Sequence, residues 1–420
     1  MALRYIFLFA IFACPSIYSI PPADTMTGVF DERIKSLRIH ALDDDFGLPV
    51  TVLGTGSQIL VEFDHLAEER EYFRYSLTHC NAFWQPSGLV ESEFLDGFNE
   101  GTIEDFEYSQ ATTVHYVHYT LAIPNQDIYP KVSGNYLLKI YPEHEPDSIF
   151  LQCRFMVSEQ TAPVQAEVTT NTDYGLNSRY QQLAITVDTE RADVDDKFND
   201  LLVVIGQNGR LDSEQLLRQP LRLQGSKLVY EHQPNLIFDA GNEYRRMEII
   251  NDQYPTMGVD HIELHPPYYH YVLYTDTPRN KEIYNYDQTQ HGRYFIRQYN
   301  SQNSDTEADY GVAHFTLDYQ GAPGDMVFLD GDFTQRRFDP NSRMVYNPST
   351  GLYERSMLLK QGAYNYQYLV VPQGGKRGYT AQIEGDKYQT ENEYFIRVYH
   401  RRPGDRYDRL IGVAAIQSRP

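Results

Sequence analysis

Short apolar runs separated by turn residues recur along the whole chain. Of all the features of the sequence, this pattern most restricts the fold that the chain can adopt. Ile34 to Ile39 and Ile59 to Phe63 alternate apolar and polar residues, as half-buried strands do. Helical periodicity is scarce, and the best helical candidate is the short segment Ser213 to Arg218. The 35 tyrosines and 21 phenylalanines suit pleated sheets, where aromatic side chains pack well. The sequence therefore predicts an all-β protein.

Polar breaks divide the 420 residues into about three domains, within the number that this length favours. We expect a first domain at residues 29–159, where about seven short strands suit an immunoglobulin-like β-sandwich. A polar linker leads to a central β domain at residues 164–300, with an Asn-Gly hairpin turn at Gln207 to Arg210. The acidic run 303–309 precedes a C-terminal domain at residues 310–420. The predicted architecture is a tandem of β-sandwiches.

The C-terminal domain is similar to the early-set sandwich of starch- and glycogen-binding modules. Its Gly331-Asp332-Phe333 turn lies between strand-like runs, as a Gly-x-Phe turn does in those modules. In the modules a binding tryptophan follows the turn, whereas Gln335, Arg336 and Arg337 follow it here. A glycan-binding protein of polysaccharide uptake is therefore an alternative function, and the missing tryptophan argues against it.

Residues 1–19 have the pattern of a secretory signal peptide. Arg4 supplies positive charge, an apolar run covers residues 5–13, and small residues lead to a cleavage position near Ser19. The apolar run is too short to span a membrane, which takes about 20 apolar residues. Charged and turn residues interrupt every later apolar stretch. We therefore expect an exported protein without a transmembrane segment.

The charge balance limits the class of partner. Lys and Arg total 36 against 58 Asp and Glu, which gives a net charge of −22. A field of this sign repels nucleic acids and anionic lipid, and it favours solubility. The sequence predicts a soluble periplasmic protein that does not bind nucleic acid and is a monomer when free.

The cysteines leave two questions open. Cys80 and Cys153 remain after signal cleavage, and in an exported chain they can form one disulfide. Both also lie in apolar strand-like runs, where a buried free thiol packs well. Cys14 offers a lipoprotein anchor, but Phe12 is bulky for the position two before a lipidated cysteine, so this anchor is disfavoured.

Two segments carry the residue types of protein interfaces. The loop from His79 to Phe98 holds the only tryptophan, and its aromatic residues either cover a local core or anchor a partner. The basic segment Arg401 to Gly412 contains Arg and Tyr, which are common at interface hot spots. Its alternative is a solvated C-terminal extension packed along the last strand. The predicted partner-interface residues are Trp84, Phe94, Phe98, Arg402, Arg406 and Tyr407.

No metal site is predicted. His261, His265 and His270 lie around Glu263, but a solvated strand edge rich in tyrosine explains them better than zinc ligands do. His115 and His118 have opposite parity and would point to opposite faces of a regular strand. The acidic clusters at residues 43–45, 193–196 and 330–332 lack the spacing of a calcium loop.

No catalytic residue and no cofactor are predicted. The chain lacks a Gly-x-Ser-x-Gly elbow, a cysteine nucleophile motif and a complete phosphate-binding loop. A pair of carboxylates for glycoside hydrolysis stays open, because 58 acidic residues offer many pairs and a sequence gives no distances.

Several long and unusual motifs resemble one family, the plug proteins of the type IX secretion system of Bacteroidota. The resemblance covers nearly the whole mature chain. The motifs are His79 to Trp84, Glu93 to Phe98, Leu121 to Asn125, Ser133 to Leu138, Asp305 to Tyr310 and Arg406 to Gly412.

The resemblance implies a periplasmic protein that binds the very large outer-membrane β-barrel translocon. It implies a reversible gate that seals the periplasmic opening while no cargo is in transit, with no covalent chemistry. None of the motifs identifies the residues of the seal.

Overall fold

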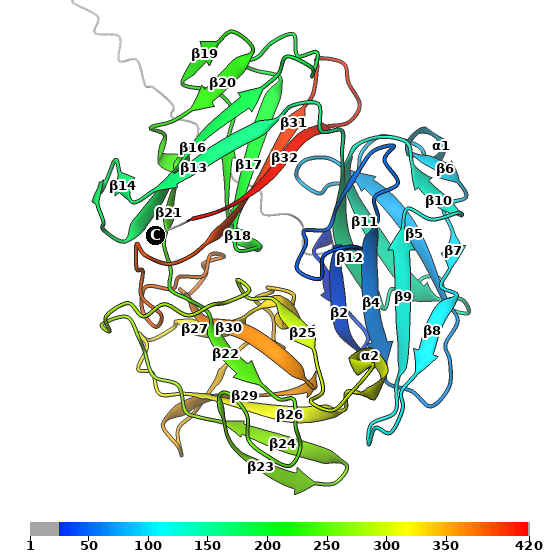
Figure 1. Ribbon diagram of the computed structural model, residues 1–420, viewed down its shortest axis with the longest axis vertical. Coiled ribbons are helices and arrows are strands. Elements are labelled where there is room, and N and C mark those ends of the chain that lie inside the picture. Colours follow the sequence, from blue (N-terminus) through cyan, green and yellow to red (C-terminus); the bar gives the residue numbers. More distant parts are fainter. Residues whose placement is uncertain (1–24, 419–420) are drawn as a thin grey trace, which may run out of the picture.

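The computed structural model describes residues 25–418, and nearly all of its regular structure is β-strand (Figure 1). This confirms the all-β prediction. The helical prediction for Ser213 to Arg218 was wrong, because this segment lies in strand β18 and pairs with β17. The predicted signal peptide 1–19, with Ser19 and Cys14, lies outside the described residues. The helical turns are α1 (Glu91–Phe94), η2 (Pro234–Leu236), α2 (Ser304–Glu307) and η3 (Asp332–Thr334).

The strands between residues 28 and 158 form two larger sheets around one core and a separate β10-β6 pair, and we call them the first unit. One sheet has the order β1-β12-β11-β5-β7 with β3 beside β12, and the other has the order β2-β4-β9-β8. Phe63 and Phe73, one from each sheet, pack edge to face in the core. The strands are β1 (Gly28–Val29), β2 (Ile34–Ala41), β3 (Val50–Val52), β4 (Ile59–His65), β5 (Phe73–Cys80), β6 (Leu95–Gly97), β7 (Gly101–Thr102), β8 (Asp105–Tyr108), β9 (Val117–Ile123), β10 (Ile128–Pro130), β11 (Gly134–Pro142) and β12 (Leu151–Ser158).

The second unit combines residues 164–239 with the C-terminal strands. One sheet has the order β13-β16-β20-β19 with β21 beside β16, and the other has the order β18-β17-β31-β32. The predicted Asn-Gly hairpin is confirmed: Asn208 and Gly209 have φ of 50° and 72° and join β17 to β18. The strands are β13 (Val164–Thr169), β14 (Asn171–Thr172), β15 (Gly175–Leu176), β16 (Tyr180–Asp188), β17 (Leu201–Gln207), β18 (Arg210–Leu217), β19 (Arg222–Gln224), β20 (Lys227–Tyr230), β21 (Ile237–Asp239), β31 (Glu393–His400) and β32 (Arg409–Gln417).

The third unit lies in the chain between β21 and β31. In one sheet β30 pairs with β22, β25 and β27, and the other sheet has the order β23-β24-β26-β29-β28. Tyr364, Tyr366 and Tyr368 of β30 are buried in its core. The strands are β22 (Arg245–Glu248), β23 (Val259–His265), β24 (Tyr268–Leu273), β25 (Tyr294–Ile296), β26 (Tyr310–Leu317), β27 (Met326–Asp330), β28 (Val345–Asn347), β29 (Leu352–Lys360) and β30 (Gly362–Val371).

These sheets cross the expected boundary between residues 300 and 310. Strands β22 and β25, expected in the central domain 164–300, pair with β30. Strand β31, expected in the C-terminal domain 310–420, pairs with β17. The pairing of the strands therefore does not follow the division expected at 300–310. The acidic run looked like a linker because it is polar, but α2 within it packs between the first and third units.

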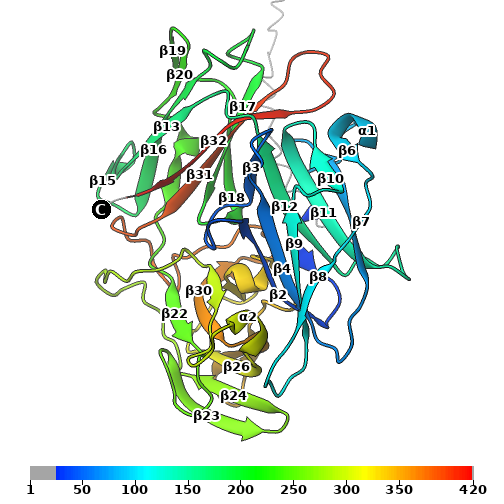
Figure 2. The same cartoon turned by 45° about the vertical axis from the view of Figure 1, so that its right-hand side comes forward.

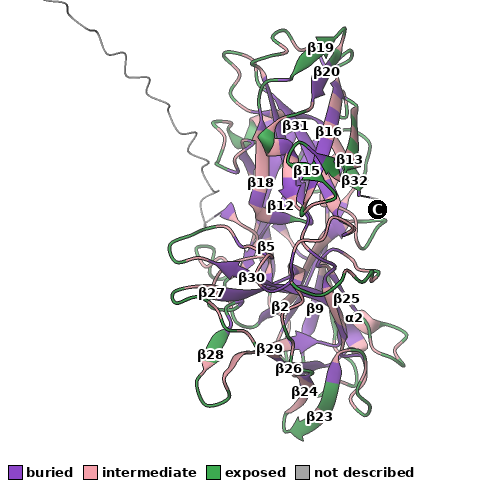
Figure 3. Cartoon of the chain, turned by 90° about the vertical axis from the view of Figure 1, so that its left-hand side faces the viewer, coloured by how far each residue is buried: buried purple, intermediate pink, exposed green. Residues whose placement is uncertain are grey.

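The three units surround a common centre (Figures 1 and 2). In Figure 1 the first unit lies on the right, the second at the upper left and the third at the lower left. Buried residues continue from one unit into the next, while β19, β23 and β28 are largely exposed (Figure 3). The contacts between the units position the candidate site residues.

Candidate functional site

The loop after β5 is folded into a tight turn that points Trp84 inward. The Trp84 backbone N–H donates to the Asn81 carbonyl, and the Ser87 N–H donates to the His79 carbonyl. Trp84 has φ of 62°, in the left-handed region, so the turn holds its side chain against the protein. Its side chain is only 3% exposed, and the Arg154 guanidinium lies 4.4 Å from the ring centroid.

Trp84 belongs to a small apolar core between the first and second units. It packs there with residues of both units, so the core closes only when the units meet. The first unit contributes Cys80, Ala82, Leu137 and Met156, and the second contributes Leu202, Val204, Tyr399 and Leu410.

The basic segment forms the turn between β31 and β32, and it packs on the loop that holds Trp84. The Arg406 Nη1 donates to Glu93 Oε1 at 2.6 Å, and the Ala82 N–H donates to Asp408 Oδ2 at 2.8 Å. The Tyr407 ring lies edge-on to His79 at 5.5 Å. The two segments that the sequence marked as interface candidates therefore contact each other.

This contact corrects part of the interface prediction. Trp84 and Phe94 do not present an aromatic surface, because both are buried and Phe94 lies in the core of the first unit. Arg402 pairs with Asp193, and Arg406 pairs with Glu93, so both guanidinium groups already have partners within the chain. That Arg402, Arg406 and Tyr407 bind another protein stays a prediction.

Phe98 is the exposed aromatic residue of this loop. Its side chain is 87% exposed, beyond the short β6–β10 pair at one end of the first unit. Gly97 fixes this geometry, because a Cβ there would lie 2.0 Å from the Asp127 carbonyl oxygen. Exposed apolar and acidic residues occur in the segment that contains Phe98 and in the turn and strand paired with it, and we call the whole set the Phe98 tip. It comprises Val90, Glu91, Asp96, Phe98, Glu100, Asp127 and Tyr129.

A network of buried charges joins the first unit to the third. Asp64 of β4 and Lys360 of β29 are 0% and 1% exposed, and their charged atoms are 2.6 Å apart. The Asp64 carboxylate also accepts from Tyr310 Oη at 2.6 Å and from His118 Nδ1 at 2.7 Å. Arg38 bridges Glu62 at 3.0 Å and Asp305 at 2.8 Å.

The electrostatics of this network favour the charged forms of Asp64 and His118, whereas burial lowers the pKa of Lys360 although Asp64 acts to raise it. Burial alone raises the pKa of Asp64, but Lys360 and His118 outweigh it and hold the pKa below its ordinary value. Burial opposes the charged form of His118, but Asp64 and Glu62 raise its pKa to about 9. Three cations (Arg38, His118, Lys360) face three anions (Glu62, Asp64, Asp305). His40 also bonds to Glu62, at 3.0 Å.

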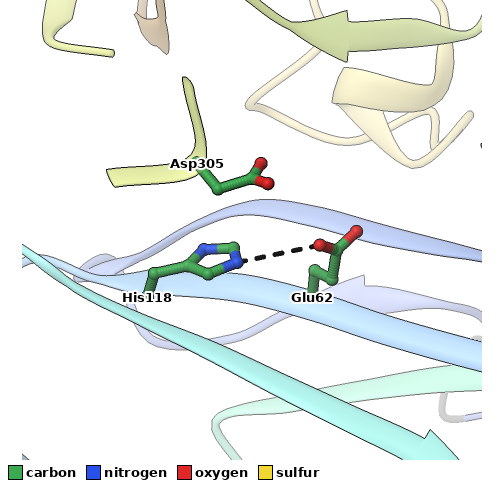
Figure 4. A group of neighbouring side chains, drawn as sticks. All are labelled: Glu62, His118 and Asp305. Carbon is green, nitrogen blue, oxygen red and sulfur yellow. Dashed lines mark ion pairs between the residues drawn. The ribbon is translucent and has the colours of Figure 1, made fainter. Parts of the chain in front are cut away.

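Three members of the network have the spacing of metal ligands but do not suit a metal ion. Glu62, His118 and Asp305 lie close together (Figure 4). His118 directs one ring nitrogen at Asp64 and the other at Glu62, so as an imidazolium it offers no lone pair. Arg38 already lies between Glu62 and Asp305. A further cation would meet three positive charges, so we assign this cluster to inter-unit contact.

The histidines near β23 do not converge on one point. Glu263 pairs with His265 at 2.8 Å and with His261 at 3.4 Å. His270 instead bonds to His314 of β26 at 2.8 Å, a residue that the sequence gave no reason to include. Within residues 25–418, the ligand atoms of His261, His265 and His270 lie too far apart to share an ion.

The two cysteines are buried free thiols. Cys80 on β5 lies opposite Asn135 of β11, and Cys153 on β12 lies opposite Leu138 of β11. One strand and an offset of three residues along it separate them, which places them more than about 10 Å apart and beyond the reach of a disulfide. The disulfide alternative for Cys80 and Cys153 was wrong for this reason.

We expect both thiols to resist modification while the chain is folded. Burial raises the pKa of the Cys80 thiol to about 11 and the pKa of the Cys153 thiol further above its ordinary value. A chain starting at residue 20 should not react with Ellman's reagent within an hour at pH 8. Both thiols should react at once in 6 M guanidinium chloride. Immediate reaction of the folded chain would contradict this burial.

The turn that resembled glycan-binding modules is buried. Phe333 in η3 is 8% exposed and packs on Phe315 and Tyr364. Arg336 points inward and bonds to the Tyr244 hydroxyl and the Asp330 carboxylate. The place of the missing tryptophan is therefore taken by a buried arginine, with no aromatic surface for a sugar.

The remaining findings concern the membrane and known proteins. Among the described residues, no helix is long and apolar enough to cross a membrane. Residues 34–159 match the family described as "Type 9 secretion system plug protein 1st domain". The chain is also similar to a solved structure, a hypothetical protein from Parabacteroides merdae, with 41% identity and a TM-score of 0.92. The alignment covers 94% of this chain and 99% of that chain. No curated protein matches.

Proposed function

Because this chain belongs to the type 9 secretion system plug protein family, we propose that it is a non-catalytic periplasmic plug. In this function it binds the large outer-membrane β-barrel translocon and seals its periplasmic opening while no cargo is in transit. The match of residues 34–159 to the plug family carries the proposal. The chain is a free monomer before it binds.

The architecture supports this function physically. A seal must keep its shape while it excludes water over a wide opening. The apolar core around Trp84 joins the first unit to the second, and the Asp64–Lys360 network joins it to the third. We propose that the two-sheet units are β-sandwiches, immunoglobulin-like in the first unit and early-set in the third. Together they make one broad, rigid body.

We propose the Phe98 tip as a contact with the translocon. Hot spots at interfaces are large aromatic residues surrounded by residues that exclude water. Phe98 is a large aromatic residue exposed on a glycine-fixed turn, and the exposed Tyr129 lies opposite Asp96 in the adjoining β6–β10 pair. The acidic residues of the tip favour a positively charged partner surface. The negative charge of the Phe98 tip opposes contact with anionic lipid. We therefore propose a protein surface as its partner.

The first test is affinity capture of the tagged mature chain from detergent-solubilised envelope, followed by mass spectrometry. We expect recovery of one very large outer-membrane barrel protein. Recovery of no such barrel from an envelope that contains the translocon would contradict the proposal.

Phe98→Glu should weaken this capture. A hot-spot aromatic is worth about 2 kcal/mol or more, so the apparent Kd should rise about thirtyfold. Tyr254→Glu is the matched control, because Tyr254 is also exposed (68%) but lies in the third unit. Equal capture by Phe98→Glu and wild type would exclude the Phe98 tip as a contact while leaving the plug function itself standing.

A further inference from the structure

A cavity of about 220 Å³ lies where the three units meet. Each unit contributes to its wall, for example Ile39 of β2, Phe395 of β31 and Tyr294 of β25. Trp84 and Met156 add further apolar surface from the first unit. Apolar cavities of roughly 150 Å³ hold a molecule of benzene, so this space holds a ring with a short arm.

Positive charge is concentrated on the wall. Five of the lining arginines, Arg38, Arg210, Arg293, Arg336 and Arg397, each pair with a carboxylate. Of the lining carboxylates, Glu214 pairs with Arg397, Asp332 pairs with Arg336, and Asp45 is solvent-exposed.

Arg154, the sixth, has no carboxylate partner among residues 25–418, and it is only 6% exposed. Its Nε donates to the Thr25 carbonyl at 2.6 Å and its Nη2 to the Thr25 hydroxyl at 3.3 Å. Its Nη1 has no hydrogen-bond partner among the described residues. Burial lowers the pKa of this guanidinium to about 10, although the Glu214 carboxylate, which itself pairs with Arg397, acts to raise it.

A buried guanidinium without a hydrogen-bonded carboxylate lowers the stability of the folded chain, so stability of the fold does not explain why Arg154 lies at this cavity. The Trp84 ring 4.4 Å away offsets part of the cost, but it satisfies no N–H group. A carboxylate would supply both the opposite charge and the missing acceptor, and guanidinium groups bind carboxylates well. Trp84, Met156 and Phe395 in the remaining wall are suited to an apolar body.

We propose that this cavity binds a small organic carboxylate with an apolar body. Its carboxylate pairs with Arg154, and its apolar body lies against Trp84, Met156 and Phe395. Such a ligand contacts the first and second units at once, so its binding stabilises their arrangement. This inference concerns a separate site from the Phe98 tip and does not depend on the plug function.

The probes are 3-phenylpropionate, benzoate and hexanoate, each compared with its neutral amide. Titration calorimetry and thermal unfolding of the mature chain measure binding. We expect at least one carboxylate to bind and raise the unfolding temperature, with its amide at least tenfold weaker. Failure of all three carboxylates at 10 mM would overturn the proposal, as would equal binding of acid and amide.

Two variants locate the site. Arg154→Met should abolish the preference for the carboxylate over the amide. Gly206→Val fills the cavity without removing a charge, because a Cβ at Gly206 meets only Glu214 side-chain atoms, at 3.7 and 3.9 Å. It should fold and lose binding of acid and amide alike. Undiminished carboxylate binding by a folded Gly206→Val chain would place the ligand elsewhere and overturn the assignment.

Discussion

Replacing Lys360 by methionine is expected to lower the free energy of unfolding by about 3–5 kcal/mol, because it removes one of the two cations that neutralise the buried Asp64 carboxylate. Asp64 is fully buried, and Lys360 supplies the ammonium 2.6 Å from its carboxylate. Methionine fills a similar volume, so the loss is electrostatic and no large cavity forms. Guanidinium denaturation followed by circular dichroism measures the effect.

Two further variants separate this effect from a general loss of charge. Asp64→Asn combined with Lys360→Met removes both charges, and the double variant should be more stable than the sum of the single losses predicts. Arg222→Met breaks a solvent-exposed pair with Glu231 and should cost less than about 1 kcal/mol. A Lys360→Met chain as stable as the Arg222→Met chain would contradict a structural role for the buried pair.

The alternation of apolar and polar residues predicted where strands occur but did not predict which strands pair within a sheet. Runs such as Ile59 to Phe63 alternate because one face of β4 packs on the core, and this alternation is visible without a structure. The pairing of β31 with β17 is not visible, because almost two hundred residues lie between the paired positions. Strand order depends on such distant contacts, and an acidic run therefore looked like a domain boundary.

The buried network shows the same limit at the level of side chains. The sequence gives little reason to single out His118, because His115 has opposite parity and would point to the opposite face of a regular strand. Its partners lie on the adjacent strand β4, and the charge that balances Asp64 comes from Lys360 in another unit. No spacing rule connects positions 64 and 360, so only the structure brings them together.

The two interface segments were predicted to contact a partner protein, and the structure gives most of their residues a partner within the same chain. An aromatic loop and a basic turn have the composition of a protein interface, and they form one between the first and second units. Composition cannot distinguish a partner within the chain from one outside it. Phe98 is exposed because Gly97 turns the chain there, and the motif itself did not separate it from buried Phe94.

Trp84→Ala is the second change with a large expected effect, because it empties the centre of the core that joins the first two units. A buried tryptophan replaced by alanine costs about 3–5 kcal/mol, and the Arg154 guanidinium also loses the ring it lies on. The loss should fall on the contact between the units more than on either unit alone. Amide hydrogen exchange followed by mass spectrometry distinguishes loss of protection at the contact between the units from loss of protection within one unit.

Protection should fall first at residues 401–410, where the turn between β31 and β32 packs on the loop. The Ala82 and Leu410 amides donate across this contact, to Asp408 and to the Ser133 hydroxyl, and both should exchange faster. The core strands β4 and β9, far from the contact, should keep their protection. Loss of protection throughout the first unit would instead mean that Trp84 supports that unit's own core.

Two controls connect this result to the seal. Trp84→Phe keeps a ring beneath Arg154 and loses no hydrogen bond, because Trp84 Nε1 has no partner among the described residues. It should therefore cost about half as much as alanine. Phe98→Ala alters an exposed aromatic in the same loop and should leave stability within about 0.5 kcal/mol of wild type. In the affinity capture, Phe98→Ala should recover less translocon than wild type while keeping its stability. Trp84→Ala should recover less translocon only to the extent that the first and second units separate. Under the proposed function, a plug whose units move independently cannot hold one continuous face against the opening.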